Sequence, residues 1–247
     1  MLIEEQLKQC HVLNDWFHTP LGQFVSKEFT EQLRFYNEHL KGDSLLQLGY
    51  CGENPWLKEL DYNNKWIASP FSMNSSIHIE TSLNQLPINR NSLDCVVIPL
   101  TLELFGNNSS LIHELDRVLK PMGFVILLSL NPYSLWGGAL KCGLLRSYSD
   151  KRVKMRTAFQ INRLFTQMGY RQCCLNNFCY IPPVNNESLI KKLIFLDEIG
   201  KMIWPFPSGF YCYIAQKYER ITPGLSVAVT KEVLSKSYET PFQPASN

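Results

Sequence analysis

The stretch Leu45–Trp56, LLQLGYCGENPW, combines an apolar run, two glycines and a polar helix start. Glycine lets the backbone pass close to a ligand, and the free N–H groups at the start of a helix attract negative charge. Gly49 and Gly52 therefore stand where a loop can hold a nucleotide cofactor. A tight turn from a strand into a helix needs glycine for steric reasons as well, so this stretch alone leaves both interpretations open.

Cysteine is the second residue type that can do chemistry, and the chain has 8 cysteines without a Cys-x-x-Cys pair. The cluster Cys173, Cys174 and Cys179 has the composition of a metal site, but neighbouring residues of a strand point to opposite faces. No secretion signal accompanies these cysteines. We expect reduced, structural thiols and no metal.

The histidines and the basic run Arg146–Arg156 offer weaker candidates. His113 falls on the polar side of an expected helix, and the other four histidines have no acidic or cysteine partner at a useful spacing. The basic run can guide an acidic or phosphate-bearing substrate, or it can be a solvated loop.

Composition sets broad limits. The chain has 247 residues, 45% of them hydrophobic and 19% charged, which predicts one α/β domain with a packed core. The net charge of +2 gives no signal for nucleic acid or a membrane surface. The N-terminus carries two glutamates and no long apolar run, so we expect a cytoplasmic protein.

The elements that position these residues follow from hydrophobic periodicity. Residues 1–40 predict two helices, with Thr19 capping the second and Pro20 as its first residue. Asn54 and Pro55 predict another helix start. Short apolar runs then alternate with helical patterns, which is typical of a doubly wound parallel sheet. The predicted fold is α/β, with N-terminal helices and a mostly parallel, seven-stranded Rossmann-like sheet whose strands lie near residues 44–48, 65–68, 77–79, 93–100, 124–130, 171–180 and 209–217.

A longer pattern carries a family resemblance. The chain reads Leu86-Pro87-Ile88, then Ser92-Leu93-Asp94, Leu102-Glu103, and Glu114 followed by RVLKPMG up to Gly123. Over Ser44–Lys217 it resembles the class I S-adenosylmethionine-dependent methyltransferases, whose members commonly read LPF-x-x-x-SFD, Leu-Glu and E-x-x-RVLKPGG. The stretches WFHTPLGQ and LNPYSLWG look like one bacterial branch of the type 11-like members.

The resemblance implies S-adenosylmethionine as cofactor, although the glycine motif is degenerate. The family reads acidic-x-Gly-x-Gly-x-Gly where this chain has Gln47, Gly49, Cys51 and Glu53. Ser69 stands near the place of a ribose-binding carboxylate, and Ser82 at the place of an adenine-binding aspartate. The implied cofactor contacts are Gln47, Gly49, Tyr50, Gly52, Ser69, Ser82, Leu83 and Pro99.

The expected substrate pocket lies at the carboxyl edge of the sheet, where ligands bind in such folds. Glu103 follows the fourth strand and is either a base or a carboxylate that starts a helix or walls the pocket. Asn131, Tyr133 and Trp136 follow the fifth strand. The two aromatic side chains can face a flat acceptor, or they can pack against the next helix. The sequence identifies no catalytic residue and no methyl acceptor.

The sequence therefore predicts a methyltransferase with a helical segment at 1–42, a methyltransferase domain at 43–218 and a loosely ordered tail at 219–247. Because acidic residues are missing at three expected places, a degenerate fold that acts as a binding or assembly module is the alternative. A nicotinamide dehydrogenase is disfavoured because Gly-x-Gly-x-x-Gly is absent.

Overall fold

The computed structural model describes residues 3–70, 78–104, 109–143, 154–202 and 207–218. Its centre is a seven-stranded sheet in the order β3-β2-β1-β4-β5-β7-β6. β7 runs antiparallel to β5 and β6, and the other pairs are parallel. The predicted Rossmann-like fold is confirmed. The strands are β1 Lys41–Leu48, β2 Asp61–Ser69, β3 His78–Glu80, β4 Leu93–Pro99, β5 Leu119–Leu130, β6 Tyr170–Phe178 and β7 Phe210–Lys217.

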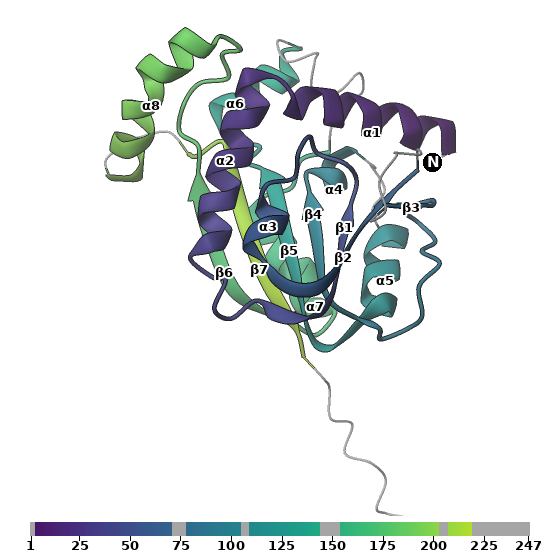
Figure 1. Cartoon of the computed structure of the whole chain (residues 1–247). Coiled ribbons are helices and arrows are strands. Elements are labelled where there is room, and N and C mark those ends of the chain that lie inside the picture. The colour runs from purple at the N-terminus through teal and green to yellow at the C-terminus, as the bar shows by residue number, and fades with distance from the viewer. Residues whose placement is uncertain (1–2, 71–77, 105–108, 144–153, 203–206, 219–247) are drawn as a thin grey trace, which may run out of the picture.

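Helices cover the sheet, and α1 lies across its carboxyl edge, above the ends of β1 and β4 (Figure 1). α8 extends beyond the β6 side of the sheet. In the described part of the chain, no helix has the length and apolar character needed to cross a membrane. The helices are α1 Ile3–Phe17, α2 Pro20–Arg34, α3 Trp56–Glu59, α4 Thr101–Leu104, α5 Ser109–Val118, α6 Leu135–Lys141, α7 Ala158–Gln167 and α8 Glu187–Met202.

Local sequence signals explain several of these boundaries. The Thr19 side chain accepts a hydrogen bond from the Gly22 N–H at 3.1 Å, which confirms the predicted cap of α2. Thr157 forms a complete capping box with Gln160 at the start of α7. The apolar stripe of α5 is buried and His113 is exposed, as the periodicity predicts.

Several boundaries differ from the predictions. The second helix ends at Arg34 rather than near Lys41, and β1 begins at Lys41 because its first residues pair with Asp61 and Tyr62 of β2. The fifth strand was expected near residues 124–130. It begins at Leu119 instead, since Leu119 already pairs with Leu93, and the Pro121-Met122-Gly123 turn lies within β5, where Met122 has φ +65°.

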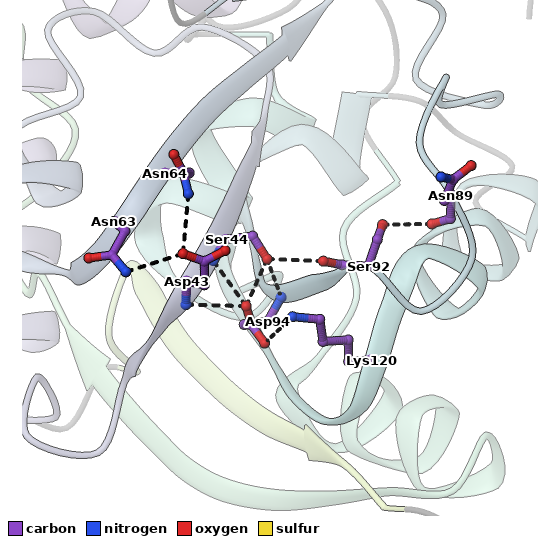
Figure 2. A network of polar contacts seen from close by, with 8 residues as sticks. All are labelled: Asp43, Ser44, Asn63, Asn64, Asn89, Ser92, Asp94 and Lys120. Atoms are coloured by element: carbon purple, nitrogen blue, oxygen red, sulfur yellow. Dashed lines mark hydrogen bonds and ion pairs between the residues drawn. The ribbon is translucent and has the colours of Figure 1, made fainter.

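Asp94 joins three strands at the amino edge of the sheet (Figure 2). Its Oδ2 accepts from the Ser44 N–H at 3.0 Å and from the Ser44 hydroxyl at 2.7 Å, while Oδ1 accepts from Lys120 Nζ at 2.8 Å. Burial on its own would raise the pKa of Asp94, but the bonds from Lys120 and Ser44 outweigh it and lower this pKa. Asp94 therefore ties β1 and β5 to β4 in its charged form.

We predict that Asp94→Asn lowers the free energy of unfolding by about 1–3 kcal/mol at neutral pH, because charge-assisted hydrogen bonds are lost. The folded pKa lies below the unfolded value of about 3.9, so the stabilisation is complete above about pH 4 and is lost as pH falls through the folded pKa. Urea unfolding of the wild type and of Asp94→Asn from pH 7 down to pH 3 measures the difference between their free energies of unfolding.

Asp61→Asn is the matched control, since Asp61 is exposed and its carboxylate lies 3.9 Å from Lys41 Nζ. It should unfold like the wild type across this range. A gap between wild type and Asp94→Asn that stays constant down to pH 3 would contradict the role given to the Asp94 charge.

Candidate functional site

The glycine loop, Gly49–Gly52, follows β1 and is held by the buried side chain of Gln47. Trp56 Nε1–H donates to Gln47 Oε1 at 2.7 Å. Gln47 Nε2 donates to the Gly49 carbonyl at 2.8 Å and to Asn54 Oδ1. Gln47 is fully buried, so these partners replace the water that its amide would otherwise bind.

The orientation of the Gln47 amide follows from its partners. An indole N–H can only donate, so the Gln47 oxygen must face Trp56 and its nitrogen must face Gly49 and Asn54. Asn54 Oδ1 also accepts from the Cys51 N–H at 3.1 Å, which fixes it as an acceptor. A carboxylate in place of Gln47 would face two oxygens without a proton to donate. The hydrogen bonds of this loop therefore suit glutamine at position 47 and not an acid.

Asn54 does not cap the following helix, contrary to the prediction. Its side chain turns back into the glycine loop, where Nδ2 donates to the Gly52 carbonyl at 2.9 Å. Pro55 occupies the cap position of α3 and no side chain bonds to the first turn of that helix. The Asn54 side chain bonds to the loop because the buried N–H and carbonyl groups of the loop need partners. The four-residue α3 offers few free donors in comparison.

The two glycines meet different neighbours. Gly49 has φ +84°, and a Cβ there would lie 3.3 Å from Thr101 Oγ1. Gly52 has φ +64°, and a Cβ there would lie 3.2 Å from the Cβ of Phe17 at the end of α1. Both positions therefore favour glycine, because other residues are strained in this backbone conformation. In the folded chain, one glycine faces the carboxyl end of β4 and the other faces the covering helix.

Helix α1 is fastened over the loop. The Gly52 N–H donates to Asn14 Oδ1 at 3.1 Å, and the Phe17 ring lies 5.8 Å from the ring of Trp56. Trp16 on the same helix packs edge-on against Trp136, with ring centroids 6.2 Å apart. The helix thus covers the backbone where a cofactor is expected.

The other predicted cofactor residues lie around the same edge. Tyr50 and Leu83 are buried, and Ser82 is half-buried in the turn that follows β3. Pro99 ends β4, and its carbonyl accepts from the Thr101 hydroxyl at 3.2 Å and from the Cys51 thiol at 3.7 Å. The carboxyl ends of β1 and β4 thus meet at the glycine loop. Direct contact of these residues with a cofactor stays a prediction.

Ser69 ends β2 and is buried, and its register partner on the edge strand β3 is Glu80. Neighbouring residues of paired strands share a face of the sheet. Glu80 is exposed, so its carboxylate reaches solvent beside the end of β2. The sequence shows no acid near Ser69, because the strand pairing alone brings Glu80, eleven positions later, alongside it.

Glu103 lies on α4, directly after β4, and is buried. Its Oε1 accepts from the Ser129 hydroxyl and from the Leu130 N–H at 3.1 Å, while Oε2 has no hydrogen-bond partner among the described residues. Burial raises the pKa of Glu103, and the bonds from Ser129 and Leu130 and the charge of Arg156 offset part of this rise. Glu103 lies in the first turn of α4, and its role as a base or a pocket wall stays a prediction.

The three residues after β5 that were expected in the substrate pocket have different environments in the structure. Asn131 accepts from the Tyr133 N–H at 3.1 Å and shapes the turn, while the Tyr133 ring is 76% exposed. Trp136 is 1% exposed, and its indole N–H donates to the Ile181 carbonyl at 2.8 Å. Trp136 thus packs in the core, and Tyr133 alone of the two rings faces solvent.

Asn14, Glu80 and Thr101 belong to this site but carry no motif. Thr101 donates to the Leu48 carbonyl at 2.7 Å and joins the ends of β1 and β4. Its place immediately after a buried strand could have indicated it, because ligands bind at the carboxyl edges of such sheets. Asn14 and Glu80 reach the site only through helix docking and strand pairing. Among the described residues, no group of three or more metal-binding side chains forms, and the cysteines are free.

A seven-stranded sheet with an antiparallel β7 and a glycine loop after β1 defines a Rossmann-like methyltransferase fold. Residues 56–127 match the family model of the methyltransferase domain, so the resemblance to the class I methyltransferases is confirmed over the motif residues. This segment begins directly after the glycine loop. A ubiquinone/menaquinone biosynthesis C-methyltransferase from Blochmanniella pennsylvanica is 34% identical over 59 residues, which are 24% of this chain and 23% of that relative.

Solved structures show the same fold over most of the chain. A methyltransferase dependent on S-adenosylmethionine from Thermotoga maritima aligns with TM-score 0.57 at 14% identity, covering 84% of this chain and 99% of that one. Another from Archaeoglobus fulgidus aligns with TM-score 0.55 at 16% identity, covering 78% and 94%. The likeness extends on both sides of residues 56–127.

We predict that Gln47→Glu lowers the free energy of unfolding by about 1–3 kcal/mol at pH 7. The substitution keeps the size of the side chain but removes both N–H donors and buries a charge against two oxygens. Gln172→Glu, on the exposed side of β6, is the matched control and should leave stability nearly unchanged. Equal urea midpoints for the two variants would show that the Gln47 amide does not hold the glycine loop.

Proposed function

We propose that this protein is a methyltransferase that uses S-adenosylmethionine, with the cofactor at the glycine loop and the ends of β1, β2 and β3. The observation that carries the proposal is the match of residues 56–127 to the methyltransferase domain, combined with a glycine loop at the carboxyl end of β1. Gln47 is proposed to act indirectly, by supporting the glycine loop. The proposed cofactor contacts remain Gln47, Gly49, Tyr50, Gly52, Ser69, Ser82, Leu83 and Pro99.

Methyl transfer asks little chemistry of the protein, because the sulfonium of this cofactor is already an electrophile. Orienting a nucleophile in line with the methyl group is the main requirement. Glu103 is buried behind the carboxyl edge, and one of its carboxyl oxygens has no hydrogen-bond partner among the described residues; its proposed role is to orient the acceptor or to take its proton.

Glu80 is proposed to bind the ribose hydroxyls in place of a carboxylate on β2. It lies in register with Ser69, and its exposure leaves the carboxylate available to a ligand. A charge-assisted hydrogen bond contributes about 1.5–3 kcal/mol. This compensates for the serine at position 69.

The second candidate function is a binding or assembly module on a methyltransferase fold. The observation in its favour is the covering of the loop by α1, because Asn14 occupies the Gly52 N–H and Phe17 lies against Gly52. Under the first proposal, the helices α1 and α2 of segment 1–42 form a cover over the domain 43–218, and this cover moves aside when the cofactor binds. The predicted tail at 219–247 lies outside the described residues. A cytoplasmic location belongs to the same proposal.

Calorimetric titration with S-adenosylmethionine, and separately with its demethylated product, tests the first proposal. We expect binding in the range of tens to hundreds of micromolar, since displacing Asn14 and Phe17 offsets part of the binding energy. No heat and no shift of the melting temperature at millimolar ligand would favour the binding module.

We predict that Glu80→Gln weakens the binding of S-adenosylmethionine by about 10- to 150-fold, the equivalent of one charge-assisted hydrogen bond. Glu38→Gln, an exposed acid in the turn after α2, removes the same charge elsewhere and should bind like the wild type. Both side chains are exposed, so both variants should fold. Unchanged affinity in Glu80→Gln would remove Glu80 from the cofactor site.

A further inference from the structure

A groove of about 540 Å³ opens beside the carboxyl edge of the sheet, between α6 and the segment that leads into α7. Such a volume lies within the range of small-molecule sites. We call it the basic groove. Its lining residues are Pro132, Lys141, Lys154, Met155, Arg156 and Gln160.

Three of these side chains are cationic. Within the described residues, Lys141, Lys154 and Arg156 form no ion pair, and Lys141 Nζ donates only to the Pro132 carbonyl at 3.3 Å. The buried carboxyl of Glu103 feels the charge of Arg156. Among the described lining residues three are cationic and none is acidic, which makes this part of the groove positive, and a concave site concentrates such a field.

The segment that carries two of the cations is anchored to the body of the protein. The Lys154 N–H donates to the Glu103 carbonyl at 3.4 Å, and the Tyr211 hydroxyl donates to the Arg156 carbonyl at 2.8 Å. Met155 between them packs against the core. The backbone that presents Lys154 and Arg156 is therefore held in place before any ligand arrives, which lowers the entropy cost of binding.

We propose that the basic groove binds the anionic group, a carboxylate or a phosphate, of a small methyl acceptor. The inference rests on the proposed methyltransferase function and names the class of its substrate. Lys141, Lys154 and Arg156 supply charge and hydrogen bonds, while Pro132 and Met155 give an apolar wall to the rest of the molecule. The acceptor then lies beside Glu103, at the edge of the sheet that also carries the glycine loop.

A small molecule fits these observations better than a nucleic acid. The net charge of the whole chain is only +2, and the described part of the groove brings together three cations in one hollow. Backbone binding of a nucleic acid requires a basic stripe that follows several phosphates.

Titration of the whole chain with inorganic pyrophosphate, and in a second arm with citrate, at low ionic strength, tests the groove. The variant is Lys154→Glu/Arg156→Glu. Its control is Arg171→Glu/Lys192→Glu, which makes the same change of charge at exposed residues of β6 and α8. We expect saturable binding of at least one anion to the wild type and the control, and a loss of at least about tenfold in the groove variant. The stronger arm distinguishes phosphate from carboxylate.

Equal affinity in all three proteins, or no saturable binding to the wild type, would overturn the inference. Tighter binding of a single-stranded oligonucleotide than of either anion, lost in the same groove variant, would assign the groove to nucleic acid and overturn it as well. S-adenosylmethionine is titrated into the same three proteins. Cofactor binding without anion binding refutes the groove alone. Anion binding without cofactor binding refutes the proposed function, and with it the methyl acceptor, and leaves an anion site in the groove.

Discussion

The buried amide of Gln47 is the constraint on which the functional edge of this protein depends. A fully buried amide must satisfy a carbonyl and two N–H groups, and Trp56, Gly49 and Asn54 together do so. That requirement sets the path of the glycine loop, turns Asn54 away from α3 and leaves Gly49 and Gly52 at positive φ. The loop is thus shaped by its own hydrogen bonds and is ready-formed without a ligand.

The amino edge of the sheet stabilises the fold, and the carboxyl edge carries the proposed sites. At the amino edge Asp94 links β1, β4 and β5, and Arg117 donates to the Leu86 carbonyl at 3.0 Å while it pairs with Glu114. The motif residues that give the family resemblance are therefore largely those that brace strands and turns. The carboxyl edge carries the glycine loop, Glu103 and the basic groove, where the ligands are proposed to bind.

Helix α1 connects the core with the proposed site. Its Trp16 and Phe17 join the rings of Trp136, Phe210 and Trp56 in one aromatic cluster, while its Asn14 bonds to the loop. Access to the loop is for this reason coupled to the packing of the helix, and the energy of that packing opposes ligand binding. The walls of the basic groove come from α6 and the approach to α7, and α6 itself packs against α1 through Trp136 and Trp16.

The sequence by itself determined the class of fold, since apolar runs of strand length alternating with amphipathic helices leave few arrangements other than a doubly wound sheet. It also determined the caps at Thr19 and Thr157 and the buried stripe of α5, because these depend on residues three or four positions apart. Only the tertiary structure decided that the Asn54 side chain bonds to the glycine loop and that Glu80 pairs with Ser69. It also decided that Trp136 is buried and that Lys141 and Arg156 line the same groove. Each of these depends on contacts between distant segments, whose competition for buried hydrogen-bond partners and packing space no local pattern records.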